Sequence, residues 1–179
     1  METKTINKLM KYLFVFLINL LLSCMNSYND EDNLSFYDIK VKTSDGDDFD
    51  LSTLTGQKLL VVNVASKCGF TPQYKQLEEL YKEYKSQNFE VLAFPSSDFA
   101  NQEYSDSHKI STFCKKNYGV TFPIFEKVSV KGKSKHSIYK WLTEKNKNGK
   151  KNVSVLWNFQ KFTVDENGRW VDYFSPTTS

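Results

Sequence analysis

The chain has 179 residues, of which 40% are hydrophobic and 25% are charged, and its formal net charge is +3. This length and composition predict one ordinary globular domain and exclude a disordered or collagen-like chain. The charge is too small to indicate a nucleic-acid-binding protein. Three cysteines are too few for a disulfide scaffold, and two histidines leave little for a metal site.

The N-terminal segment, residues 1–23, is predicted to be a signal peptide. Lysines within residues 1–11 precede a short apolar run over residues 12–22, whereas a membrane-spanning helix needs about 20 apolar residues. The run ends in Leu21-Leu22-Ser23-Cys24, which resembles the bacterial lipobox. We therefore expect Cys24 to be lipidated and to become the mature N-terminus. The alternatives are a plain signal peptide with an incidental cysteine, or a short membrane anchor.

Residues 24–34 are polar and lack periodicity, which predicts a tether to a domain that spans residues 35–179. Together with lipidation at Cys24, this predicts a membrane-anchored lipoprotein of a bacterial cell envelope, either periplasmic or on the surface. Without lipidation, the same signal predicts a secreted protein.

The hydrophobic pattern of the domain predicts alternating strands and helices. It gives an N-terminal β-hairpin turning at Ser44-Asp45-Gly46, a buried strand over 59–65, a helix that begins with Thr71 as N-cap and Pro72, a strand over 89–94, a helix from Ser105 or Ser107, a short helix over 137–143, and strands over 159–164 and 169–174. This order predicts an α/β fold in which helices flank a central mixed sheet.

Cys68 follows the predicted buried strand and precedes the first predicted helix, where open α/β sheets usually carry their chemistry. The unpaired N–H groups and the dipole of a helix N-terminus favour an anion, so this position favours the reactive thiolate. The alternative is a buried cysteine that acts as a small hydrophobic side chain. The polar neighbours Asn63, Ser66 and Lys67 argue against that alternative.

Two other thiol chemistries fit the sequence poorly. A thiol–disulfide oxidoreductase needs a Cys-x-x-Cys motif, but residues 68–71 read Cys-Gly-Phe-Thr. A cysteine hydrolase needs a histidine base. His108 and His136 both adjoin lysines in polar segments, where we expect solvated side chains.

Three blocks of the domain resemble the glutathione peroxidase family of the cysteine type, and they occur in the order and spacing of that family. They are Asn63–Thr71, Leu92–Glu103, and Trp157-Asn158-Phe159 followed by Lys161-Phe162. The resemblance implies a thioredoxin-like fold. It also implies a thiol-dependent peroxidase that reduces hydrogen peroxide or organic hydroperoxides and protects against oxidative stress.

The resemblance further implies a catalytic tetrad of Cys68, Gln102, Trp157 and Asn158, with Cys68 as the peroxidatic residue. The other three supply neutral N–H donors, which stabilise a thiolate and a leaving oxygen without adding a titrating group. No metal or other cofactor is expected, because an external thiol supplies the electrons. The oxidised Cys68 would be a sulfenic acid, which a second thiol must resolve. Cys114 is the candidate resolving cysteine, and its alternative is a buried helix residue.

Several departures from the family pattern carry expectations of their own. Arg169 is the only arginine, so no arginine cluster for glutathione is evident, and a thioredoxin-type reductant is favoured over glutathione. The segment 144–156 is short, which favours a monomer. Asp98 replaces a neutral residue of the second block and would disfavour the thiolate if it were unpaired. The chain stops at Ser179, where the family usually continues into a last helix.

Two other functions remain open from the sequence. One is a peroxide sensor or disulfide relay, in which oxidised Cys68 passes its oxidation to a partner protein. The other is a non-enzymatic lipoprotein that keeps only the fold.

Overall fold

The computed structural model describes residues 35–178. The predicted signal peptide, Cys24 and the tether over 24–34 therefore lie outside the described residues. Within those residues, no helix has both the length and the apolar character needed to cross a membrane.

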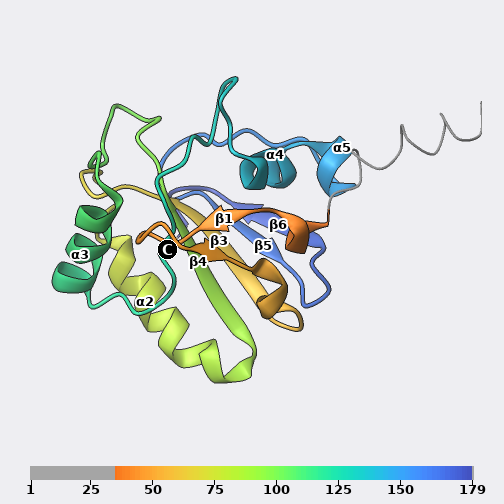
Figure 1. Ribbon diagram of the computed structural model, residues 1–179, viewed down its shortest axis with the longest axis horizontal. Helices are drawn as coiled ribbons and strands as arrows, with labels where there is room; N and C mark the ends of the chain where they lie inside the picture. Colours follow the sequence, from red (N-terminus) through yellow and green to blue (C-terminus); the bar gives the residue numbers. More distant parts are fainter. Residues whose placement is uncertain (1–34, 179) are drawn as a thin grey trace, which may run out of the picture. The chain divides into compact units, whose positions relative to one another are not determined.

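The centre of the domain is a four-stranded mixed sheet in the order β4-β3-β5-β6 (Figure 1). Its strands are β3 (Lys58–Val64), β4 (Phe89–Pro95), β5 (Lys161–Val164) and β6 (Trp170–Phe174). β3 pairs with β4 in parallel and with β5 antiparallel, while β5 and β6 form the predicted C-terminal hairpin. The expected α/β fold with a central mixed sheet is confirmed.

The predicted N-terminal hairpin is also present, as a separate two-stranded sheet of β1 (Val41–Lys42) and β2 (Asp48–Phe49). The 3-10 helices η1 (Phe36–Asp38) and η2 (Leu51–Leu54) precede and follow it. These pieces pack onto the main core through buried side chains such as Phe36 and Leu51.

The segment over residues 123–126 lies along the outer edge of β4 and connects it to the hairpin. The Ala93 amide donates to the Pro123 carbonyl at 3.1 Å, and the Phe125 amide donates back to the Ala93 carbonyl at 3.0 Å. On its other side, the Glu126 amide donates to the Lys42 carbonyl at 2.8 Å. The outer edge of β4 is therefore occupied around Ala93.

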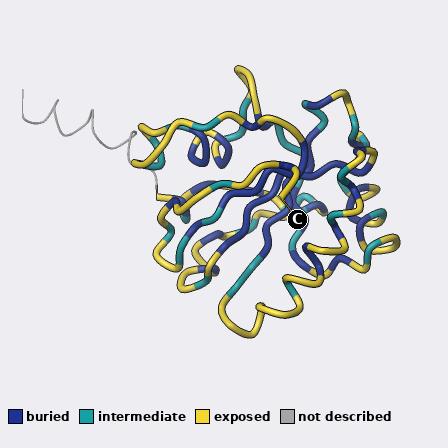
Figure 2. Tube along the Cα trace, turned by 180° about the vertical axis from the view of Figure 1, so that it is seen from behind, coloured by how far each residue is buried: buried dark blue, intermediate teal, exposed yellow. Residues whose placement is uncertain are grey.

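The sheet is buried on both faces, which explains the unbroken apolar run in β3. Leu59 and Val61 contribute to the cluster on the face covered by α4 (Ser137–Thr143). The alternate residues Leu60, Val62 and Val64 contribute to the cluster under α2 (Gln73–Tyr84) and α3 (Ser107–Tyr118). Figure 1 shows α2 and α3 on one side of the sheet and α4 on the other, and Figure 2 shows the buried strands between them.

Two local predictions differ from the structure. Thr71 does not cap α2, whose N-cap position is Pro72 without a side-chain hydrogen bond, because the Thr71 hydroxyl bonds to the preceding loop. The segment 144–156 contains a short helix, α5 (Lys145–Asn148), that was not predicted. A further 3-10 turn, η3 (Lys85–Gln87), links α2 to β4.

Candidate active site

Cys68 lies in the tight loop between β3 and α2, and only 8% of its surface is exposed. The Thr71 hydroxyl shapes this loop by accepting from the Cys68 amide at 2.9 Å and donating to the Ala65 carbonyl at 2.8 Å. The Phe70 amide donates to the Cys68 Sγ at 3.4 Å. Gly69 is exposed, and a side chain in its place would meet no atom of a non-adjacent residue within 4 Å. The thiol is therefore held next to a backbone donor in a loop that a small substrate can approach.

Two predicted tetrad residues contact each other directly. The Asn158 Nδ2 donates to the Gln102 Oε1 at 3.0 Å. The Gln102 backbone carbonyl accepts from the Lys67 amide at 2.9 Å, which ties this pair to the residue before Cys68. Because the side-chain oxygen of Gln102 accepts from Asn158, the N–H groups of the Gln102 side chain remain free to donate to another group.

Trp157 is brought to the same place by Asn63, a buried residue of β3. The Asn63 Nδ2 donates to the Trp157 carbonyl at 3.0 Å, and the Phe159 amide donates to the Asn63 carbonyl at 2.6 Å. The Trp157 ring packs against the Phe99 ring at 5.3 Å between centroids and is 37% exposed. A single polar side chain inside an apolar strand thus positions the Trp157-Asn158 pair, and that interruption was the sequence signal for it.

Left-handed backbone conformations occur next to the predicted site residues. Ala100 and Asn101, immediately before Gln102, have φ of 52° and 51°, and Phe159, immediately after Asn158, has φ of 67°. Such conformations cost about 1–3 kcal/mol each in residues other than glycine and tend to occur at functional sites. These conformations were not predicted, because no glycine marks the three positions.

Glu103 is a further residue of the site that the sequence analysis missed. Its carboxylate accepts from the Ser66 amide at 3.1 Å and from the Tyr104 amide at 2.8 Å, and it is buried. Burial raises the pKa of the Glu103 carboxyl above its usual range. Together with the Lys67–Gln102 bond, it clamps the end of β3 to the Gln102 segment.

The Asp98 carboxylate is paired, so the condition under which it would disfavour the thiolate is not met. Its Oδ2 accepts from the Val130 amide at 2.6 Å, from the Lys131 amide at 3.1 Å and from the Ser129 hydroxyl at 2.9 Å. Asp98 therefore holds the loop over residues 129–131 in place.

Cys114 lies on α3 with no exposed surface, and it shares one apolar cluster with Cys68. Both thiols are free. Burial raises the pKa of the Cys114 thiol to about 12, and the phenol of Tyr74 lies beside it. In the packed domain, Cys114 is therefore a protonated thiol without access to solvent.

The expectation of solvated histidines is met by His108 but is wrong for His136. His108 is exposed, but His136 is half-buried and its Nδ1 accepts from the Ile138 amide at 3.3 Å at the start of α4. Burial lowers the pKa of His136. His136 thus serves as a helix cap, a role that its polar neighbours in the sequence concealed.

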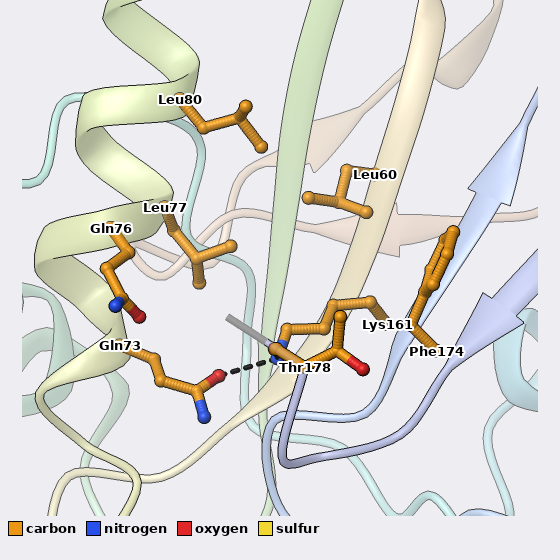
Figure 3. Close-up of a pocket in the computed structure, with 8 residues that line it drawn as sticks. All are labelled: Leu60, Gln73, Gln76, Leu77, Leu80, Lys161, Phe174 and Thr178. Carbon is orange, nitrogen blue, oxygen red and sulfur yellow. Dashed lines mark hydrogen bonds between the residues drawn. The ribbon is translucent and has the colours of Figure 1, made fainter.

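An apolar pocket of about 270 Å³ lies between α2 and the sheet and contains none of the four predicted tetrad residues (Figure 3). Its lining includes Lys161, a buried lysine whose Nζ donates to the Gln73 Oε1 at 2.5 Å and to the Thr178 carbonyl. Burial lowers the pKa of Lys161 to about 8. Among residues 35–178, no cluster of three or more His, Cys, Asp or Glu side chains is arranged to hold a metal ion.

Comparison with known proteins assigns the chain to a family. The sequence profile described as glutathione peroxidase matches residues 36–143. Glutathione peroxidase-like peroxiredoxin 2 of Saccharomyces cerevisiae is 47% identical over 144 residues, which cover 80% of this chain and 89% of that protein. The glutathione peroxidase homolog BsaA of Bacillus subtilis is 47% identical over 146 residues, covering 82% and 91%.

Solved structures agree with this assignment. The crystal structure of Trgpx in its apo form is similar with a TM-score of 0.64 and 37% identity, covering 82% of this chain and 88% of that one. A thioredoxin-family thiol:disulfide interchange protein from Chlorobium tepidum matches with a TM-score of 0.55 and 15% identity, covering 75% and 80%. The second likeness shows the fold alone and confirms that it is thioredoxin-like. The chain belongs to the glutathione peroxidase family.

Proposed function

We propose that this domain is a thiol-dependent peroxidase that reduces hydrogen peroxide or organic hydroperoxides through Cys68. The observation that carries the proposal is the Cys68 loop, where the sulfur accepts a backbone N–H and the linked amides of Gln102 and Asn158 are tied to the adjacent residue. Family membership supports the activity, and protection against oxidative stress is its expected role.

In the reaction, the Cys68 thiolate attacks one peroxide oxygen and the O–O bond breaks. The other oxygen takes a proton and leaves as water or an alcohol, while Cys68 becomes a sulfenic acid. The N–H donors of Gln102, Trp157 and Asn158 stabilise the negative charge on the sulfur and on the leaving oxygen. One such donor contributes about 10²–10³-fold to the rate in other enzymes.

Cys114 is the proposed resolving residue. Its thiol would condense with the Cys68 sulfenic acid, so that an S–S bond forms and water leaves. Because Cys114 is fully buried on α3, this step requires local unwinding of that helix. A disulfide needs its two Cα atoms within about 7 Å, which sets how far α3 must bring Cys114.

The electrons come from an external thiol, and we propose a thioredoxin-type protein rather than glutathione. Its two thiols would become a disulfide while the oxidised peroxidase gains two electrons. The peroxiredoxin names of the yeast relatives support this choice. We propose that no metal or other cofactor takes part and that the protein acts as a monomer.

We further propose that the domain works at a membrane of a bacterial cell envelope, tethered through lipid on Cys24. The basis is the signal-like sequence over residues 1–23, which ends at Leu21-Leu22-Ser23-Cys24. Labelling of cells with a radioactive fatty acid tests it. Label in the wild-type chain but not in Cys24→Ala supports the anchor, and unlabelled wild-type protein rejects it.

Peroxide consumption by the wild-type domain and by Cys68→Ser tests the main proposal. We expect the variant to lose activity with both hydrogen peroxide and an organic hydroperoxide, and undiminished turnover would refute the assignment. Mass spectrometry after one equivalent of peroxide then tests the second step. A Cys68–Cys114 disulfide supports resolution within the chain, whereas a lone sulfenic acid or a glutathione adduct removes Cys114 from the mechanism.

The same experiment separates the peroxidase from a sensor or relay. Burial of Cys114 is the observation that favours the relay, because slow resolution leaves oxidised Cys68 available to a partner protein. Rapid formation of a mixed disulfide with a partner, together with slow turnover with every small reductant, would favour the relay.

A further inference from the structure

Two groups of lysine and aromatic side chains adjoin the proposed active site. Next to Cys68, the Lys67 Nζ lies 4.3 Å from the centroid of the Tyr104 ring, and the Lys109 Nζ lies 4.5 Å from the same centroid. Next to Trp157, the Lys131 Nζ lies 4.3 Å from the centroid of the Phe99 ring, which packs on the Trp157 ring. We call Lys67, Lys109 and Lys131 the lysine rim.

The lysine rim carries uncompensated positive charge. All three side chains are exposed, and among residues 35–178 none has a carboxylate within 4.0 Å. The acidic residues in neighbouring segments accept hydrogen bonds from backbone amides instead. Asp98 accepts from the 129–131 loop, the buried Glu103 accepts from two backbone amides, and Asp106 caps α3 by accepting from the Lys109 amide at 2.6 Å.

The aromatic contacts give the rim a defined geometry. A free lysine side chain samples many rotamers, whereas an ammonium group over a ring is attracted to the ring face even at an exposed site. The two groups also rest on fixed parts of the site. Tyr104 follows the Glu103 clamp, and Lys131 belongs to the loop that Asp98 holds.

An exposed apolar surface belongs to the same region. Leu156 is 66% exposed and Trp157 is 37% exposed. Protein-docking surfaces combine an apolar centre with a polar or charged periphery, and a small hydrophilic thiol has no apolar surface to cover Leu156. The combination therefore fits a protein partner.

We propose that the lysine rim docks the acidic face of the protein dithiol that re-reduces this enzyme, and that Leu156 and Trp157 contact an apolar surface around the partner's cysteine. This rests on the proposed function, because it names the partner of that same site. The partner's thiolate attacks the oxidised Cys68 sulfur and displaces the Cys114 thiol, or water from a sulfenic acid. The partner's second thiol then releases reduced Cys68, and the partner becomes a disulfide.

Charge reversal tests the proposal. The rim variant carries Lys67→Glu, Lys109→Glu and Lys131→Glu, and the matched control carries Lys58→Glu, Lys145→Glu and Lys150→Glu. The control lysines are equally exposed and lie at the start of β3 and around α5, so the net charge changes by the same amount. The two half-reactions are measured separately by stopped flow, with hydrogen peroxide as oxidant and a bacterial thioredoxin as reductant, at about 20 and 300 mM salt.

We expect the rim variant to lose about tenfold or more in the second-order rate constant with thioredoxin at low salt, because steering of the encounter is lost. The control should lose far less, and the salt dependence of the wild-type reaction should disappear only in the rim variant. Equal losses in both variants, or an equal fall in the rate constant with peroxide, would overturn the proposal.

Two further measurements separate other ligands of the rim. If the rim variant loses as much rate with glutathione as with thioredoxin, the lysines bind a small anion and the protein-docking proposal is wrong. If it reacts normally with thioredoxin but no longer binds vesicles of anionic phospholipid, the rim faces a membrane and the proposal is again wrong. A wild-type domain that consumes no peroxide would instead refute the proposed function itself.

Discussion

Cys68 and Cys114 belong to one apolar cluster, but their surroundings differ. Cys68 lies in a loop at the end of a strand, with a backbone N–H at its sulfur and open space beside it. Cys114 lies inside a helix, has no exposed surface and has a pKa raised to about 12 by burial.

This difference fits the order of the two steps that we propose, in which Cys68 is oxidised first and Cys114 resolves it afterwards. The thiolate is the reactive form of cysteine, so Cys68, with a backbone N–H at its sulfur, is better placed to react with peroxide than the protonated thiol of Cys114. Cys114 gains access only when α3 opens. In the mechanism that we propose, burial keeps Cys114 from direct oxidation by peroxide until Cys68 has reacted.

Removal of Cys114 should have the largest effect, because it should stop the second proposed step and leave the first intact. We expect Cys114→Ala to keep a single rapid reaction with peroxide but to lose sustained turnover with thioredoxin, because the sulfenic acid is no longer resolved within the chain. Stopped-flow and steady-state assays on the same preparation measure the two. Ser111→Ala, another buried position on α3, is the control. Sustained turnover in Cys114→Ala would show that the two thiols do not cooperate.

Loss of one neutral donor should slow only the Cys68 step. We expect Gln102→Met to reduce the rate constant with peroxide by about 10²–10³-fold, since the amide N–H at the developing charge is lost. The free energy of unfolding should also fall, by about 1–3 kcal/mol, because the buried Asn158 Nδ2 loses the Gln102 Oε1 as its acceptor. Gln76→Met, at an exposed position of α2, is the matched control. A fall of similar size in both variants would reject a direct role for Gln102.

The Thr71 hydroxyl should determine the stability of the Cys68 loop. We expect Thr71→Val to destabilise the domain by about 1–3 kcal/mol, because the Cys68 amide and the Ala65 carbonyl lose their partner in a buried place. Thr71→Ser keeps the hydroxyl and should lose much less. Urea unfolding measures both changes, and equal losses would mean that the Thr71 methyl group, not its hydroxyl, carries the effect.

The smallest expected effect is a loss of folding stability at alkaline pH, caused by the Cys114 thiol. Its thiol has a pKa of about 12 in the folded domain against a reference value of 9.0, so the unfolded chain releases the proton first. The stability contributed by the protonated thiol is therefore complete below pH 9 and is lost progressively above it, by at most about 1.4 kcal/mol per pH unit. Urea midpoints of wild type and Cys114→Ala, compared between pH 8 and 10, measure it. Parallel curves would contradict the expectation.

Much of the fold followed from local patterns. The apolar run of β3, the turn at Ser44-Asp45-Gly46 and the terminal hairpin each carry a strong periodic or turn signal, and all three are present in the structure. The failure at Thr71 has a physical cause. A threonine before a proline is a good helix cap in isolation, but here the tertiary loop competes for its hydroxyl.

The site was predicted by resemblance rather than by local pattern. The blocks named Gln102 and Asn158, but the bond between their amides joins residues that lie 56 positions apart, which no periodicity can predict. Asn63 and Glu103 lie in the same blocks, but their roles in supporting the site were found only in the structure. Buried polar residues beside a predicted site are the signal that would have identified both.

The segment along the outer edge of β4 has a consequence for the behaviour of the protein at high local concentration. An unpaired strand edge is a template for pairing between molecules, and tethering to a surface raises the local concentration at which such pairing starts. α3 packs on the face of the sheet, while residues 123–126 bond to its edge. Opening of α3 in the proposed cycle would leave these bonds to Ala93 intact, so this stretch of the β4 edge would stay covered.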